Sequence, residues 1–181
     1  MTLPTRPPER FRTDRLRLRK PTVADAPAIF RAYAADPDVA RYTAWTPHRS
    51  VATVTAFLKR CERNWRSGHE FTWAILPKGR SQPIGMASMR IMGHQAGLGY
   101  VLARAHWGQG YMTEVVTMLA DWAIARPAIH RVWACCDVEN PASARVMEKA
   151  GLAREGVLRR WLMHPNMGTA PRDGFVHARV K

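Results

Sequence analysis

The sequence has few cysteines and no long apolar run. Three of its 181 residues are cysteine, at positions 61, 135 and 136; this is too few for a disulfide framework, and the adjacent pair could close only a strained ring. We therefore expect reduced thiols and a cytoplasmic protein. No run approaches the roughly 18 apolar residues of a membrane span, and the opening MTLPTRPPERFR is charged and proline-rich where a secretory signal is apolar. Neither an anchor nor a targeting segment is predicted.

Acidic side chains are also scarce. The chain carries 14 Asp and Glu against 28 Lys and Arg, a formal net charge of +14, which suggests a polyanionic partner or ligand. The arginines are scattered rather than gathered in the single basic run of an RNA-binding arm. The histidines show no metal-ligand spacing, so no metal site is predicted. Hydrophobic residues make up 46% of the chain, enough for a folded core.

Hydrophobic periodicity predicts a mixed α/β sheet. Residues 1–12 show no periodicity and are expected to form a loose arm before a single domain, residues 13–181. Period-two alternation predicts strands at 16–20, 71–76, 84–91, 97–103, 131–137, 153–159 and 174–180, and helical spacing predicts helices near 25–35, 50–65, 112–126 and 140–150. The strand, helix, strand order across 97–137 predicts one parallel pair joined by a right-handed crossover. We therefore expect a mostly antiparallel sheet of six to seven strands with about four helices.

The segment YVLARAHWGQGYMTE, residues 100–114, has the pattern of an anion-binding loop. A predicted strand enters a short loop containing Gly108 and Gly110, and the loop continues directly into an amphipathic helix. Backbone N–H groups then meet a helix N-terminus, which favours phosphate, and glycine permits close approach of the backbone. Thr113 adds a hydroxyl donor. The loop lacks the Gly-Lys-Ser/Thr of a Walker motif and the third glycine of a dinucleotide motif, and a plain tight turn remains the alternative.

A second informative segment is DVENPASARVMEKAGLAREG, residues 137–156. Asn140 is a predicted helix N-cap, with Pro141 in the first helical position. Ser143 shares a helix face with Val146 and Met147, so its hydroxyl needs a partner on an inward face. The alternative is a serine that bonds back to the helix backbone.

Together these segments resemble the GNAT superfamily of acyl-CoA-dependent N-acetyltransferases, in which a Gln/Arg-x-x-Gly-x-Gly/Ala loop cradles the CoA pyrophosphate. LRLRKPTVADA, HWGQGYMTE, VENPASARVMEKAGL and EGVLRRW resemble, in order and spacing, the branch that includes the Rim-type ribosomal-protein N-terminal acetyltransferases. The resemblance covers about residues 14–180. It departs from the loop pattern at Trp107, where Gln or Arg is usual, and at Met112, where a small residue is usual. The Met112 side chain must therefore point away from the phosphates.

The resemblance implies that acetyl-CoA lies in a slot where two parallel strands separate, near Val101 and Val132. The backbone of Val101, Leu102 and Ala103 would bind the pantetheine, which Asn140 would also contact. Ser143 would lie near the sulfur and protonate the leaving thiolate, while a backbone N–H would stabilise the developing oxyanion. The implied pyrophosphate site comprises Trp107, Gly108, Gln109, Gly110, Tyr111, Met112 and Thr113.

A general base is expected because a protonated amine cannot attack a carbonyl. The ribosomal-protein branch carries a carboxylate several residues after the EG dipeptide, and the corresponding position here is Leu162. His164 is the leading substitute because an imidazole accepts a proton near neutral pH. Glu155 and Asp173 are alternatives, and a structural role for His164 also stays open.

The predicted function is acetyl-CoA-dependent transfer of an acetyl group to a primary amine by direct attack, with no metal and no cysteine nucleophile. The alternative is a ribosome- or nucleic-acid-binding module with lost or weak catalysis, favoured by the +14 charge and the missing acid. The phosphate loop together with Asn140 and Ser143 favours the enzyme. A protein N-terminus, a small amine or antibiotic, or an amino acid would suit as acceptor, and monomer and homodimer are both open.

Overall fold

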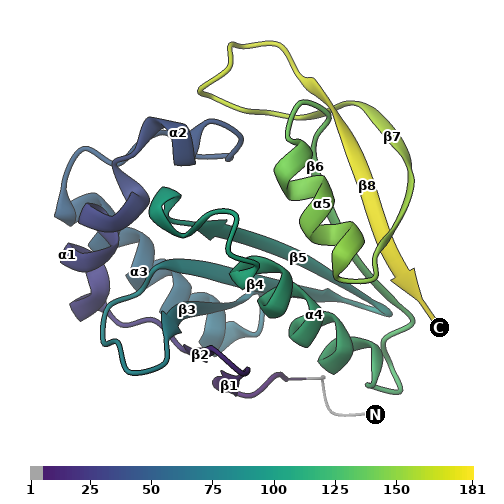
Figure 1. Ribbon diagram of the computed structural model, residues 1–181, viewed down its shortest axis with the longest axis horizontal. Coiled ribbons are helices and arrows are strands. Elements are labelled where there is room, and N and C mark those ends of the chain that lie inside the picture. The colour runs from purple at the N-terminus through teal and green to yellow at the C-terminus, as the bar shows by residue number, and fades with distance from the viewer. Residues whose placement is uncertain (1–5) are drawn as a thin grey trace.

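Within the described part of the chain, eight strands form one sheet in the order β1-β2-β3-β4-β5-β6-β8-β7. The computed structural model describes residues 6–181 (Figure 1). The strands are β1 (Arg10–Arg12), β2 (Leu16–Arg19), β3 (Phe71–Pro77), β4 (Gly85–Met92), β5 (Gln95–Leu102), β6 (Arg131–Asp137), β7 (Ala153–Leu162) and β8 (Arg172–Val180). The α-helices are α1 (Ala26–Ile29), α2 (Pro37–Ala40), α3 (Val51–Ser67), α4 (Tyr111–Ile124) and α5 (Pro141–Lys149). Every strand pair is antiparallel except β5 with β6.

The helices begin and end where the local chemistry favours it. The Ser50 side chain accepts a hydrogen bond from the Thr53 N–H at the start of α3, and Gly68 ends that helix at φ +75°. Asn140 caps α5 in the same way through the Ser143 N–H, and Pro141 takes the first helical position. These boundaries agree with the sequence predictions.

Helices cover both faces of the sheet (Figure 1). The segment with α1, α2 and α3 packs on one face, over a buried cluster that includes Ile29, Leu58 and Met86. Helices α4 and α5 pack on the other face, over a larger cluster that includes Leu119 and Met147. A cavity that is open to both faces must therefore pass through a gap in the sheet.

The predicted fold class is confirmed, including the parallel pair, and the strand predicted at 131–137 matches β6 at both ends. The expected loose arm is wrong at its end, because residues 10–12 form the edge strand β1; the part of the arm at residues 1–5 lies outside the described residues. Phe11 anchors β1 by packing edge-on against Trp73 and Trp122, with ring centroids 5.5 and 6.1 Å apart. Helix α2 was missed because four residues are too short to show helical periodicity.

Within residues 6–181, the thiols of Cys61, Cys135 and Cys136 are free. No helix in that range is long and apolar enough to cross a bilayer, and no cluster of three or more His, Cys, Asp or Glu side chains is placed to hold a metal ion.

Gly85 is required where β4 approaches β5. A Cβ at this position would lie 2.4 Å from the Val101 carbonyl oxygen, so we expect Gly85→Ala to lower the free energy of unfolding by about 1–3 kcal/mol through overpacking. Urea denaturation measures this change. Gly156→Ala is the matched control, because a Cβ there meets nothing within 4 Å; equal stability loss in both variants would contradict the account.

Candidate active site

The two parallel strands separate soon after they pair. Residues 95–97 of β5 pair with residues 131–133 of β6, and no further pairs form although β5 continues to Leu102 and β6 to Asp137. The expected separation of the parallel pair is thus present. It leaves a gap in the sheet bordered by the carboxyl ends of both strands.

The backbone of β5 presents polar groups to this gap. The Ala103 N–H donates to the Ile84 carbonyl at 2.8 Å, and Val101 lies opposite Met86 in the same register. Because antiparallel pairs alternate, the peptide groups of Val101 and Ala103 face β4 while those of Tyr100 and Leu102 face the gap. The groups available to a ligand in the gap therefore belong to Tyr100 and Leu102.

The loop after β5 forms an open cradle of backbone amides. Gly108 and Gly110 adopt φ of +73° and +76°, a left-handed conformation that side chains disfavour. A Cβ on Gly108 would meet nothing within 4 Å. Gly110 is the N-cap of α4, so the N–H groups of the first helical turn have no partner within the helix. Such a cradle fits an anion of the size and charge of a pyrophosphate.

Arg15, which directly precedes β2, holds this loop in place. Its guanidinium donates to the Gln109 carbonyl at 2.9 Å and to Glu114 Oε2 at 2.7 Å, and its backbone N–H donates to Glu114 Oε1 at 3.0 Å. Gln109 also bonds back to the Ala105 carbonyl. Sequence reasoning missed Arg15, since its partners lie more than 90 residues away.

The two departures from the usual loop pattern have structural explanations. Trp107 Nε1 donates to the Leu102 carbonyl at 2.7 Å, so the indole fastens the loop to the end of β5 while remaining half exposed. Met112 is buried in the core beneath α4. Its side chain therefore leaves the amide cradle open, as expected.

Ser143 lies at the gap beside a partner that sequence reasoning missed. Its Oγ is 2.8 Å from the Tyr100 hydroxyl, which extends from β5. Burial raises the pKa of Tyr100 above its ordinary value, although the hydrogen bond with Ser143 opposes this, so the phenol keeps its proton. Two hydroxyl groups thus meet between β5 and α5, one from each side of the gap. The sequence feature that could have indicated this partner is a tyrosine near the end of the strand before the loop. The sequence alone does not show whether its side chain belongs to the core or to the site.

His164 is buried against protein atoms. It is 5% exposed, and its Nδ1 donates to the Thr43 carbonyl at 3.3 Å. Its Nε2 lies 3.4 Å from Asp137 Oδ2, is shielded from solvent and makes no hydrogen bond. Burial alone would raise the pKa of Asp137, but hydrogen bonds from Arg172 and the Glu139 N–H hold it below its ordinary value. A proton acceptor must touch its substrate, so this geometry favours the structural role for His164.

The other base candidates lie outside the cavity lining. Glu155 is paired with Arg131, and Asp173 Oδ1 accepts a hydrogen bond from the Arg160 N–H at 2.9 Å. Leu162, at the position of the missing acid, does line the cavity. The cavity wall therefore has an apolar side chain at the position where the ribosomal-protein branch carries a carboxylate.

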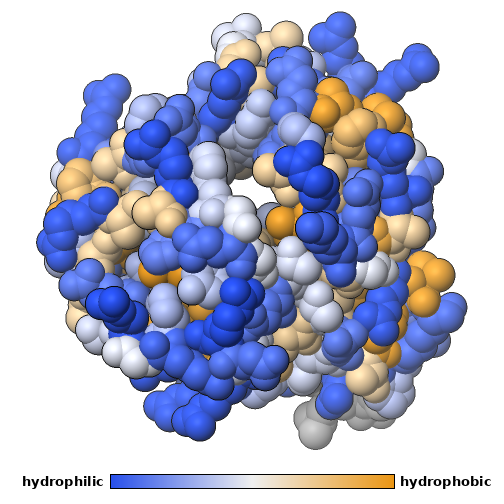
Figure 2. All heavy atoms as spheres, viewed as in Figure 1, coloured by the Kyte–Doolittle hydropathy of each residue, from blue (hydrophilic) through white to orange (hydrophobic). Residues whose placement is uncertain are grey.

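A large cavity of about 2160 Å³ connects the gap to both faces of the sheet. It is lined by the loop before α4 and by α5 on one side, and by residues around α2 and α3 on the other. Figure 2 shows the surface hollowed between α2 and α5. A cavity of this size is large enough for two substrates that meet at the gap.

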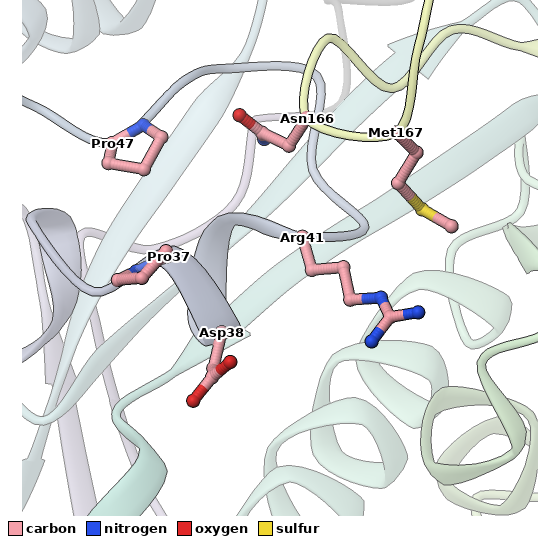
Figure 3. A pocket seen from close by; sticks show the side chains of 6 residues that line it. All are labelled: Pro37, Asp38, Arg41, Pro47, Asn166 and Met167. Atoms are coloured by element: carbon pink, nitrogen blue, oxygen red, sulfur yellow. The ribbon is translucent and has the colours of Figure 1, made fainter.

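Hydrogen bonds fasten the segment after α2 across this cavity. The Tyr42 hydroxyl donates to the Glu139 carbonyl at 2.9 Å, and Asn166 Nδ2 donates to the carbonyls of Ala40 and Trp45 at 2.6 and 2.8 Å. We call residues 40–45 the strap. A smaller pocket beside it, of about 380 Å³, is lined by residues of α2 and of the connection between β7 and β8 (Figure 3).

A separated parallel strand pair, followed by an amide cradle at a helix N-terminus, forms an open site for an anionic ligand beside a gap in the sheet. Residues 15–153 match the model of the acetyltransferase (GNAT) domain, so the chain belongs to the GNAT acetyltransferase family and is an N-acetyltransferase that uses acetyl-CoA. It is 30% identical over 172 residues to YoaA of Bacillus subtilis, described as an uncharacterised N-acetyltransferase, covering 93% of this chain and 95% of YoaA.

Two solved structures with bound ligands share the fold. The microcin C7 self-immunity acetyltransferase MccE, in complex with acetyl-CoA and AMP, superposes with a TM-score of 0.83 at 19% identity, covering 93% of each chain. RimL, the ribosomal L7/L12 α-N-protein acetyltransferase in complex with CoA, superposes with a TM-score of 0.80 at 20% identity, covering 93% of this chain and 95% of RimL. The neighbours thus include the branch whose resemblance the sequence showed.

The amide cradle can be tested with a charge placed inside it. Gly108→Asp adds a carboxylate where we expect the pyrophosphate, so it should weaken acetyl-CoA binding at least tenfold, or about 1.4 kcal/mol. Calorimetry measures the affinity. Gly68→Asp is the matched control, because Gly68 has φ +75°, open space around its Cβ position and a place outside the cavity. Equal affinities for the two variants would contradict the phosphate site.

Proposed function

We propose that this enzyme transfers an acetyl group to a primary amine by direct attack of the amine on the thioester. The observation that carries the proposal is the pair of hydroxyl groups, Tyr100 and Ser143, at the gap between β5 and β6. When bound, acetyl-CoA supplies the activated acyl group. We propose that residues 13–181 act as a single domain.

The residues proposed to bind acetyl-CoA follow the gap from the strand to the loop. The end of β5 would hydrogen-bond the pantetheine through the peptide groups that face the gap. The loop would hold the pyrophosphate, and Asn140, already the cap of α5, would lie along the pantetheine arm. The full proposed set is Tyr100, Leu102, Trp107, Gly108, Gln109, Gly110, Tyr111, Met112, Thr113, Asn140 and Ser143; Val101 and Ala103, which the sequence predicted for the pantetheine, turn their peptide groups to β4 instead.

Ser143 is proposed to protonate the departing thiolate. A serine hydroxyl alone is a weak acid, but the Tyr100 phenol lies 2.8 Å away and retains its proton. As Ser143 gives its proton to the thiolate, its Oγ would take the proton of the Tyr100 phenol, and the Tyr100 phenolate would be reprotonated by the water that receives the amine proton. The pair would therefore work as a short relay in which the proton lost by the amine replaces the one gained by the thiolate.

Removal of the amine proton does not require His164 in this proposal. The His164 ring lines the cavity, but its Nε2 is shielded from solvent and faces Asp137. Four arginines line the acceptor side of the cavity: Arg41, Arg49, Arg60 and Arg63. Nearby positive charge lowers the pKa of an ammonium group, which raises the share of neutral amine at a given pH. We propose that water takes this proton and that His164 instead positions the strap through Thr43.

The hydroxyl relay predicts a loss in turnover with little loss in binding. Ser143→Ala should lower kcat at least tenfold while the acetyl-CoA Kd changes less than twofold, because the proton matters only as the C–S bond breaks. Tyr100→Phe should have a smaller effect, and the double variant should be no slower than Ser143→Ala. Thiol-release kinetics measure these rates. Equal turnover in Ser143→Ala and the parent would leave the Ser143 hydroxyl with a packing role against Tyr100 alone.

The dependence of the rate on pH distinguishes a structural role of His164 from a role as general base. The rate constant should rise with pH as the acceptor loses its proton, and His164→Asn should keep this ascending limb while the free energy of unfolding falls by about 1 kcal/mol through the lost hydrogen bond to Thr43. Steady-state rates from pH 6 to 10 (about the range in which amines titrate) give the profile. If the folded His164→Asn variant loses this rise of the rate constant with pH, His164 is the general base and the proposal is contradicted.

A further inference from the structure

Among the charged side chains of residues 6–181 that line the cavity, the Asp and Glu residues form ion pairs. The Arg and Lys residues do not. The lining acids are Asp38, Glu70, Glu114 and Glu139, and each forms an ion pair with an arginine outside the cavity: Arg104, Arg90, Arg15 and Arg172 respectively. The lining bases are Arg41, Arg49, Arg60, Arg63, Arg145 and Lys149, and within residues 6–181 none of them has a carboxylate partner within 4 Å. The cavity is therefore strongly positive.

These bases fall into two groups on opposite sides of the gap. Arg145 and Lys149 belong to α5, as Ser143 does, and so lie on the side of the gap where we propose that acetyl-CoA binds. The other four come from the segment of α2 and α3. A CoA molecule bound by the loop before α4 leaves that second group without an anion.

The four arginines of the second group are exposed at the cavity, and within residues 6–181 none of them pairs with an acid of the protein. Figure 3 shows Arg41 and Asp38 extending away from each other although both come from the region of α2. Arg60 lies over the Phe57 ring, 5.2 Å from its centroid. His48, also in the lining, has its pKa lowered by burial and further by the charge of Arg60, so it stays neutral and adds no positive charge.

We propose that the acceptor is a primary amine whose own molecule carries carboxylate or phosphate groups, recognised by Arg41, Arg49, Arg60 and Arg63. This inference rests on the proposed acetyl transfer to an amine and names its substrate class. An anionic acceptor offsets the repulsion between these arginines and its ammonium group, while the same arginines favour the neutral amine that attacks. The basic group lies in a cavity crossed by the strap, a setting that suits small anionic groups better than a nucleic-acid backbone.

Charge-matched acceptor pairs test this proposal. The probes are glutamate α-amide against glutamine α-amide, phosphoethanolamine against ethanolamine, and the C-terminally amidated peptide Ser-Glu-Glu-Glu against amidated Ser-Gln-Gln-Gln, each with acetyl-CoA and thiol release as the readout. We expect kcat/KM to be at least tenfold higher for the charged member of a pair, with the preference shrinking as salt rises. Preference in the first two pairs identifies a small acidic amine, and preference in the peptides identifies an acidic N-terminal segment.

Variants locate the origin of the preference. Arg60→Gln/Arg63→Gln should reduce the charged-to-neutral ratio at least fivefold. Lys59→Gln is the matched control on the same helix, because Lys59 is exposed and outside the cavity lining, and it should leave the ratio unchanged. Arg41→Gln and Arg49→Gln, measured separately, cover the case in which the double variant does not fold, as judged by its melting curve. Equal rates within every pair would overturn this inference and leave the proposed function standing; no turnover of any amine would overturn both.

Discussion

The active site depends on the early separation of β5 and β6. Three residue pairs hold these strands together, after which each continues alone. A parallel pair that continued to Leu102 would occupy the peptide groups of Tyr100 and Leu102 in a ladder and close the sheet. The separation instead exposes backbone donors and acceptors, brings the Tyr100 side chain within reach of Ser143, and joins the spaces on the two faces. In the proposed reaction, the two substrates approach the same point from opposite faces.

The elements around the gap are held by contacts that span the chain. Arg15 braces the amide cradle from the N-terminal strands, and the strap is tied to Glu139 and Asn166 from the C-terminal third. Buried Asp137 joins this network through Arg172 and faces His164. His164, which the sequence favoured as a proton acceptor, contacts Thr43 of the strap and faces Asp137, so we propose that it positions the acceptor side.

The sequence predicted the features that depend on local order along the chain. Gly108, Gly110 and the amphipathic pattern after them indicated the amide cradle, and Asn140-Pro141 indicated the start of α5, because caps and glycine conformations are decided within a few residues. The pairing of Tyr100 with Ser143 joins residues 43 positions apart, and the contact of His164 with Thr43 joins residues 121 apart. The same holds for the paired acids and unpaired arginines of the cavity. A net charge of +14 indicated an anionic ligand, but only the fold shows which arginines lack a carboxylate.

Hydrogen–deuterium exchange with and without acetyl-CoA tests most directly whether the gap is the place where the cosubstrate binds. Among residues 6–181, the first amides of α4 and the gap-facing amides of β5 have no protein partner. The account predicts that acetyl-CoA slows exchange in residues 100–113 and 140–143, with little change in β1, β2 and the outer strand β7. Protection elsewhere, with exchange in residues 100–113 unchanged, would contradict it.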